Sequence, residues 1–144
     1  MDYVVSMFVN RPYVVTLVLT FMVVAAAERG WLRMVLWLIV GTFIGWLSEF
    51  ISVRTGFPFS WYEYYPANFS HELWLGGIPL FASLSFAAMS YFGHSAAYTL
   101  LSPLHQGPGG IERTENMKLL LSIKVALWAA LLTTWTDFVV DPVA

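Results

Sequence analysis

Acidic side chains within apolar stretches are the first candidates for chemistry. Glu49 follows Gly41 and Gly45 on one face of a helical pattern, because residues three or four apart share a face of a helix. The two glycines also predict a close approach to a second helix. A charged and unpaired acid inside a bilayer costs about 2.5 kcal/mol or more. We therefore expect Glu49 to be protonated, and so a proton donor, or hydrated, or paired with Arg54 as a structural alternative.

A second acidic pair ends another apolar run. Ala126, Ala130 and Thr133 form a stripe that leads to Asp137 and Asp141. The two aspartates lie one helical turn apart, where like charges repel and favour protonation of one of them. We take both as candidate catalytic acids, although a helix-end role explains Asp141 equally well.

The stretch after Glu49 reads RTGFPFSWYEYY, a turn followed by a cluster of aromatic residues. Trp and Tyr are favoured at the membrane–water interface, so an interfacial belt explains most of the cluster. Trp46, Phe57 and Phe59 lie nearer the acid and could line a pocket for a flat or elongated apolar ligand. Aromatic faces also stabilise a cation where water is excluded.

Composition places these residues in a membrane protein. Hydrophobic residues make up 58% of the 144 residues and charged residues 11%, whereas a soluble domain carries roughly 25% charged residues. The chain has no cysteine, which excludes disulfides and thiolate chemistry. A net charge of -2 argues against a nucleic-acid partner.

The apolar runs predict an all-α integral membrane protein with a single domain, residues 1–144. A spanning helix needs about 20 residues. We expect a bundle of four transmembrane helices, with the aromatic segment as an interfacial loop between the second and third. The predicted spans are residues 13–27, 34–53, 75–101 and 119–140. The segment SPLHQGPGGIERTEN is expected to be a surface loop.

Basic residues suggest an orientation in the inner membrane. They are more frequent in the loops after the first and third spans than on the opposite side. The positive-inside rule then places those loops in the cytoplasm and both termini on the outer side. With four spans, Glu49, the aromatic loop and the C-terminal aspartates converge at one membrane surface.

The histidines give little support for a metal site. His71, His94 and His105 show no metal-ligand spacing, and no protein-bound metal is expected. His94 lies in the third predicted span, where a hydrogen-bonded role is the simpler reading and ligation of a chlorophyll magnesium the alternative.

Four motifs together resemble a known family. Glu49, RTGFPFSWYEY, GGIPLFASLSF and WTDFVVDPVA are similar to the bacterial and archaeal carotenoid biosynthesis membrane proteins of the CruF type, over residues 49–144. Members include hydratases that add water across the terminal double bond of an acyclic carotenoid end group, without a cofactor. The resemblance implies roles for Glu49, Thr55, Gly56, Pro58, Tyr62, Tyr64, Pro79, Asp137, Asp141 and Pro142. With the aromatics above and Trp135, these residues are the predicted site.

The resemblance also has two departures. Family members usually have glycine at the position of Ser60, and they continue beyond the DPV motif, so the chain resembles a member shortened at its C-terminal side. Three functions therefore remain open. They are a hydratase, a non-catalytic carotenoid- or chlorophyll-binding or assembly subunit of a photosynthetic membrane complex, and half of a heteromeric carotenoid cyclase. The last two imply other membrane subunits as partners.

Overall fold

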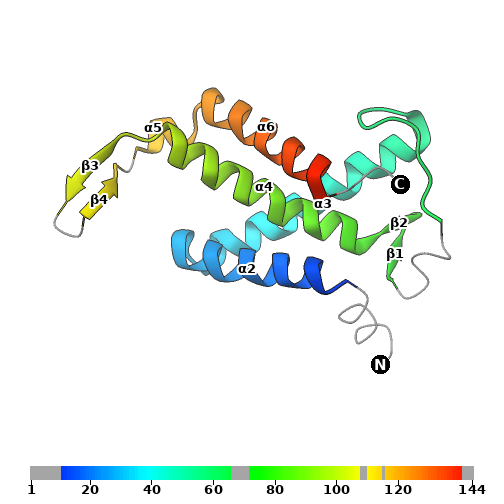
Figure 1. Ribbon diagram of the computed structural model, residues 1–144. Coiled ribbons are helices and arrows are strands. Elements are labelled where there is room, and N and C mark those ends of the chain that lie inside the picture. Colours follow the sequence, from blue (N-terminus) through cyan, green and yellow to red (C-terminus); the bar gives the residue numbers. More distant parts are fainter. Residues whose placement is uncertain (1–10, 66–71, 108–109, 115, 141–144) are drawn as a thin grey trace. The chain divides into compact units, whose positions relative to one another are not determined.

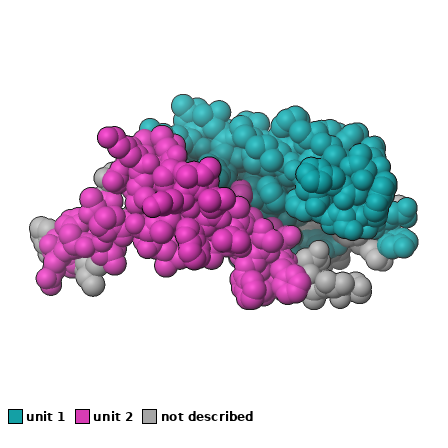
Figure 2. Space-filling model, turned by 90° about the horizontal axis from the view of Figure 1, so that it is seen from above, with its two compact units in different colours: residues 1–88 teal, residues 89–144 magenta. Residues whose placement is uncertain are grey.

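The computed structural model describes residues 11–65, 72–107, 110–114 and 116–140, and these are mostly helical (Figure 1). Residue contacts divide the chain into two compact units, residues 1–88 and 89–144 (Figure 2). The boundary falls within helix α4, Leu80–Leu101.

Two consecutive helices of the first unit pack against each other. Helix α2 spans Pro12–Arg29 and helix α3 spans Trp31–Thr55. Pro12 occupies the first turn of α2, where a missing N–H leaves no carbonyl unsatisfied. Gly30 joins the helices with a φ of 85°, a left-handed value that favours glycine. Both helices contain the predicted spans and extend beyond them.

The predicted close approach of a second helix at Gly41 and Gly45 is present. A Cβ atom added at Gly41 would lie 2.9 Å from Ala87 Cβ, and one at Gly45 would lie 2.9 Å from Phe86 Cβ. Both partners belong to the first half of α4. Trp37 Nε1 also donates a hydrogen bond to Ala87 O at 3.2 Å. The helix backbones can meet here because glycine offers no side chain.

A short hairpin precedes α4, where the sequence predicted the third span to begin at residue 75. Strand β1, Trp74–Leu75, pairs antiparallel with β2, Ile78–Pro79. Gly76 and Gly77 form the turn with φ values of 59° and 87°. Two positive φ values suit a tight two-residue turn, which glycine adopts without steric cost. The helix therefore starts only at Leu80.

The second unit departs from the sequence prediction in two elements. The predicted surface loop contains a hairpin of β3, Leu104–Gly107, and β4, Gly110–Arg113. The predicted fourth span is divided into α5, Met117–Leu120, and α6, Ile123–Val140. The hydroxyl oxygen of Ser122 accepts a hydrogen bond from Val125 N at 3.3 Å and caps the start of α6.

The stripe predicted on α6 is covered only in part: Thr133 lies against Gly93, but the two alanines do not face inward. Ala126 and Ala130 are exposed, whereas Val125 and Ala129 are buried. The physical reason is the close packing of Gly93 on α6, where an added Cβ atom would lie 2.9 Å from Ala129 O. Small residues mark close approach on either helix, so their spacing alone did not show which face of α6 is covered.

Two helices are long and apolar enough to cross a membrane, judged by length and composition among the described residues. They are α2 and α3. Their exposed large side chains include Leu36, Ile39 and Phe43. These features are consistent with a membrane protein.

We predict that Gly45→Val destabilises the first unit by about 1–3 kcal/mol, since the new methyl groups overlap Phe86 at its Cβ atom and force the helices apart. Thermal unfolding in mild detergent measures the effect. Ala130→Val is the control, because Ala130 is exposed and a surface change is worth about 0.5 kcal/mol or less. Equal losses in the two variants would contradict the packing described here.

Candidate functional site

A left-handed glycine ends α3 and starts the aromatic segment. Gly56 has a φ of 76°, and its N–H donates to Ser52 O at 2.8 Å. An added Cβ atom would also lie 2.5 Å from Trp61 Nε1. This geometry is the usual glycine cap of a helix C-terminus. The predicted site residue Gly56 thus has a definite structural role.

Side chains of the last helical turn hold the segment that follows. The hydroxyl of Thr55 donates to Ile51 O at 2.8 Å and accepts from Phe57 N at 3.3 Å. Ser52 is fully buried, and its hydroxyl accepts from Phe59 N at 3.2 Å. The peptide bond between Phe57 and Pro58, within the same turn, is cis. The turn is therefore fixed by bonds that run back onto α3.

Ser60 stands where members of the resembled family usually have glycine. Its φ is 94°, which makes it a non-glycine residue in the left-handed region. Ser60 N also donates to Gly56 O at 3.0 Å, which closes the turn. An L-residue in this region costs about 1–2 kcal/mol, and glycine avoids that cost. A glycine at this position in relatives would thus fit the backbone seen here.

The β1–β2 hairpin lies on the C-terminal part of α3. Trp46 Nε1 donates to Leu75 O at 3.0 Å. Arg54 donates to Gly76 O at 3.2 Å and to Phe50 O at 3.0 Å, and its guanidinium lies 3.5 Å from the Phe50 ring centroid. The predicted pairing of Arg54 with Glu49 is replaced by these contacts. The hairpin also buries the predicted site residue Pro79.

Glu49 on α3 accepts a hydrogen bond from a tyrosine of the aromatic segment. The hydroxyl of Tyr64 donates to Glu49 Oε2 at 2.9 Å, and both residues are half-buried. Burial, the largest cause, and the hydrogen bonds with Glu49 and Tyr62 raise the pKa of Tyr64. Tyr64 therefore keeps its proton and remains a donor. Glu49 and Tyr64, predicted separately as a catalytic and a binding residue, form one unit.

Aromatic rings surround Tyr64 on two sides. Its ring meets Tyr62 edge to face at 5.4 Å between centroids and Trp74 edge to face at 6.3 Å. Such pairs are worth about 0.5–1.5 kcal/mol beyond their burial. Phe57 and Phe59 are instead exposed. The aromatic segment thus has an inner part that positions the acid and an outer part that remains accessible.

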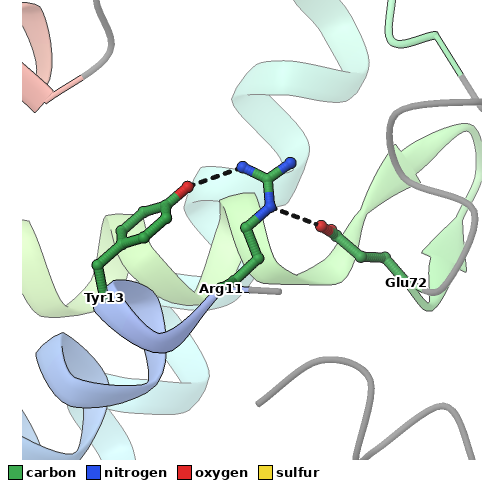
Figure 3. A network of polar contacts seen from close by, with 3 residues as sticks. All are labelled: Arg11, Tyr13 and Glu72. Atoms are coloured by element: carbon green, nitrogen blue, oxygen red, sulfur yellow. Dashed lines mark hydrogen bonds and ion pairs between the residues drawn. The ribbon is translucent and has the colours of Figure 1, made fainter. Parts of the chain in front are cut away.

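A second polar cluster connects the start of α2 to the hairpin (Figure 3). Arg11 Nε lies 3.1 Å from Glu72 Oε1, and Arg11 donates from another nitrogen to the Tyr13 hydroxyl at 2.7 Å. Glu72 is buried, and burial raises its pKa although Arg11 pulls it down. Sequence reasoning missed Glu72, because a lone acid outside a periodic pattern gives no spacing signal.

The remaining predicted site residues lie on α4 or α6 in the second unit, or outside the residues that the structure describes. Asp137 and Trp135 are exposed residues of α6 in the second unit. Their convergence with Glu49 remains a prediction. Asp141 and Pro142, like His71, lie outside the described residues. His94 is half-buried on α4, and its role as a chlorophyll ligand also remains a prediction.

The fold and this site define a class of protein. The described part is mainly helical, two helices can span a membrane, and an acid near the end of one is held by an aromatic segment. An acid in such a setting is a candidate for chemistry on a ligand that dissolves in the bilayer.

Comparison with known families assigns the chain within this class. The family model described as carotenoid biosynthesis protein matches residues 10–144. The chain belongs to this family, so the predicted resemblance to carotenoid biosynthesis proteins is confirmed. No curated protein and no solved structure gave a significant match.

We predict opposite effects for two changes in the turn. Ser60→Gly stabilises the protein by up to about 1 kcal/mol, because relief of the left-handed serine exceeds the entropy that glycine loses. Gly56→Ala destabilises it by about 1–2 kcal/mol, since alanine must adopt the positive φ beside Trp61. Thermal unfolding in detergent measures both. A loss of stability in Ser60→Gly would contradict the backbone described here.

Proposed function

We propose that the protein hydrates the terminal double bond of an acyclic carotenoid, with Glu49 as the proton donor. The observation that carries the proposal is the hydrogen bond between Tyr64 and Glu49 near the end of a long apolar helix. Membership in the carotenoid biosynthesis family supports the substrate class.

The tyrosine determines where the acid can carry its proton. Because the hydroxyl of Tyr64 donates to Oε2, a neutral Glu49 holds its own proton on Oε1. That proton adds to one carbon of the terminal alkene as the π bond breaks. A tertiary cation forms at the other carbon, and Glu49 is left as a carboxylate. A proton delivered by a fixed acid in this way is general acid catalysis.

Water completes the reaction. Its oxygen bonds to the cationic carbon, and one of its protons leaves, so the net change is addition of one water molecule. No redox step occurs, and we propose that no cofactor is required. A neighbouring carboxylate would accept the water's proton. Asp137 and Asp141 are the sequence candidates for this second role.

The surroundings of Glu49 suit an apolar polyene. Phe57 and Trp61 are 72% and 71% exposed at the same end of α3. Their faces would contact the chain of the carotenoid, and aromatic rings near the reacting end would stabilise the cation by about 0.5–2 kcal/mol each. Two further predicted binding residues, Tyr62 and Pro79, would line the side of the carotenoid site that faces the protein interior.

We further propose that the chain crosses the inner membrane four times, with α4 and the α5–α6 segment as the other two spans. The exposed apolar side chains of α2 and α3 would then contact lipid and other membrane subunits. The aromatic loop would lie at the outer surface, where Trp and Tyr are favoured.

We predict that Glu49→Gln lowers the hydration rate by at least about 10²–10⁴-fold, because glutamine cannot donate an acidic proton. Incorporation of heavy oxygen from labelled water into an acyclic carotenoid measures the rate. The matched control is Glu63→Gln, an identical change at an exposed position of the same segment. Parent-like incorporation by Glu49→Gln would show that another group supplies the proton.

We predict a smaller loss for Tyr64→Phe, about 10-fold to 100-fold, because the carboxylate that forms as Glu49 gives up its proton loses a hydrogen bond worth about 1.5–3 kcal/mol. Tyr65→Phe is its control, since Tyr65 is exposed. If both tyrosine variants react at the parent rate, Tyr64 does not position the acid.

The four-span arrangement predicts that residue 60 and residue 144 lie on one side of the membrane. Cysteine introduced singly at Ser60 and at Ala144 should react with an impermeant thiol reagent from the same side. The native chain has no cysteine, so the background is clean. Labelling from opposite sides would exclude an even number of spans between the two positions.

A further inference from the structure

Glu72 is a buried carboxyl group with one oxygen held and one oxygen unpartnered. It is 9% exposed, and Arg11 holds Oε1 at 3.1 Å (Figure 3). Oε2 is buried and has no hydrogen-bond partner among the described residues. A buried acceptor without a donor costs more than the same acceptor in water. Such an oxygen lacks a donor, because the described residues do not supply one.

Several contacts place Glu72 at the same end of the first unit as Glu49. Arg11 and Glu49 each lie nineteen residues from Gly30, one before it and one after it. Because α2 packs back against α3, equal rise along the two helices brings these positions to similar heights. Glu72 is bound to Arg11 there.

The hairpin gives a second connection. Glu72 lies two residues before Trp74, and the ring of Trp74 contacts Tyr64 at 6.3 Å between centroids. Tyr64 in turn donates to Glu49. From these two connections, one through α2 and one through β1, we infer that the two acids lie at the same end of the first unit.

We propose that Oε2 of Glu72 binds the water molecule that adds to the carotenoid cation and accepts its proton. This inference rests on the proposed hydration. A water molecule supplies the donor that Oε2 lacks. Burial raises the pKa of Glu72, which makes it a stronger base than an exposed carboxylate, and the ion pair with Arg11 favours its carboxylate form. Glu49, held by the neutral Tyr64, is the proposed acid. The two acids are thus prepared for opposite roles by a cation in one case and a phenol in the other.

The proton balance follows from these roles. Glu49 gives one proton to the alkene carbon, the water oxygen bonds to the cationic carbon, and the O–H bond that breaks gives its proton to Glu72. Glu72 then returns a proton to solvent, and solvent reprotonates Glu49. The side chain of Arg11 is 28% exposed and that of Glu72 is 7% exposed, so we propose that the proton leaves the pair on the Arg11 side. One water is consumed, and the acids end in their starting states.

An isotope experiment separates this role from a structural one. In heavy water, Glu49 adds a deuteron to the alkene carbon. If water is not captured, the Glu49 carboxylate removes a proton from the same carbon, and the recovered carotenoid carries deuterium. We expect Glu72→Gln to lower hydration by about 10²-fold while deuterium in the recovered carotenoid rises relative to product. Glu63→Gln should keep the parent ratio, because Glu63 is exposed.

Each outcome decides the proposal. Unchanged hydration in Glu72→Gln would overturn the role of Glu72 and leave the proposed function intact. An equal fall in hydration and in deuterium exchange would have the same meaning. A parent protein that hydrates no acyclic carotenoid would overturn both. If Glu72→Gln is not recovered in folded form, Glu72→Asp is assayed in its place. Aspartate keeps the negative charge beside Arg11, but its shorter side chain moves the carboxylate away from the water molecule. We expect the same rise of deuterium in the recovered carotenoid relative to product.

Discussion

The hydrogen bond from Tyr64 to Glu49 is the constraint on which this end of the molecule depends. It joins a loop residue to a helix residue fifteen positions earlier, so the chain between them must turn back onto α3. Gly56 makes that turn possible by adopting a left-handed conformation. The hairpin anchored by Trp46 then places Trp74 against the outer side of Tyr64.

The energies of this arrangement are closely balanced. A charged and unpaired acid within a bilayer costs about 2.5 kcal/mol or more, and a hydrogen bond to a charged group returns about 1.5–3 kcal/mol. One tyrosine thus offsets much of this cost at the moment when Glu49 gives up its proton, without holding the acid permanently charged as a buried arginine would. Arg54, the nearest basic residue in sequence, is directed instead to carbonyl oxygens of Phe50 and Gly76. An acid in such a balance can exchange its proton with a substrate.

Local patterns predicted part of this structure. Helical spacing identified Glu49 and the glycine contact of α3, because a side chain's face on a helix follows from its position alone. The β1–β2 hairpin was missed because its two-residue apolar strands resemble a helix end in sequence. The β3–β4 hairpin was missed because its short polar strands lie in a Gly/Pro-rich segment that is typical of a loop. The inner face of α6 was assigned to Ala130 instead of Ala129, since the deciding contact with Gly93 comes from another helix. Glu72 was missed because its ion pair joins distant residues.

The central claim is that Glu49 is neutral and carries its proton on the oxygen opposite Tyr64. Infrared spectroscopy of the protein in lipid at neutral pH tests it, because a protonated carboxyl group has a carbonyl stretching band that a carboxylate lacks. The account predicts a band that disappears in Glu49→Gln, persists in Glu63→Gln and moves to higher frequency in Tyr64→Phe, where the hydrogen bond to the carbonyl is lost. A parent spectrum in which Glu49→Gln removes only carboxylate bands would contradict the account.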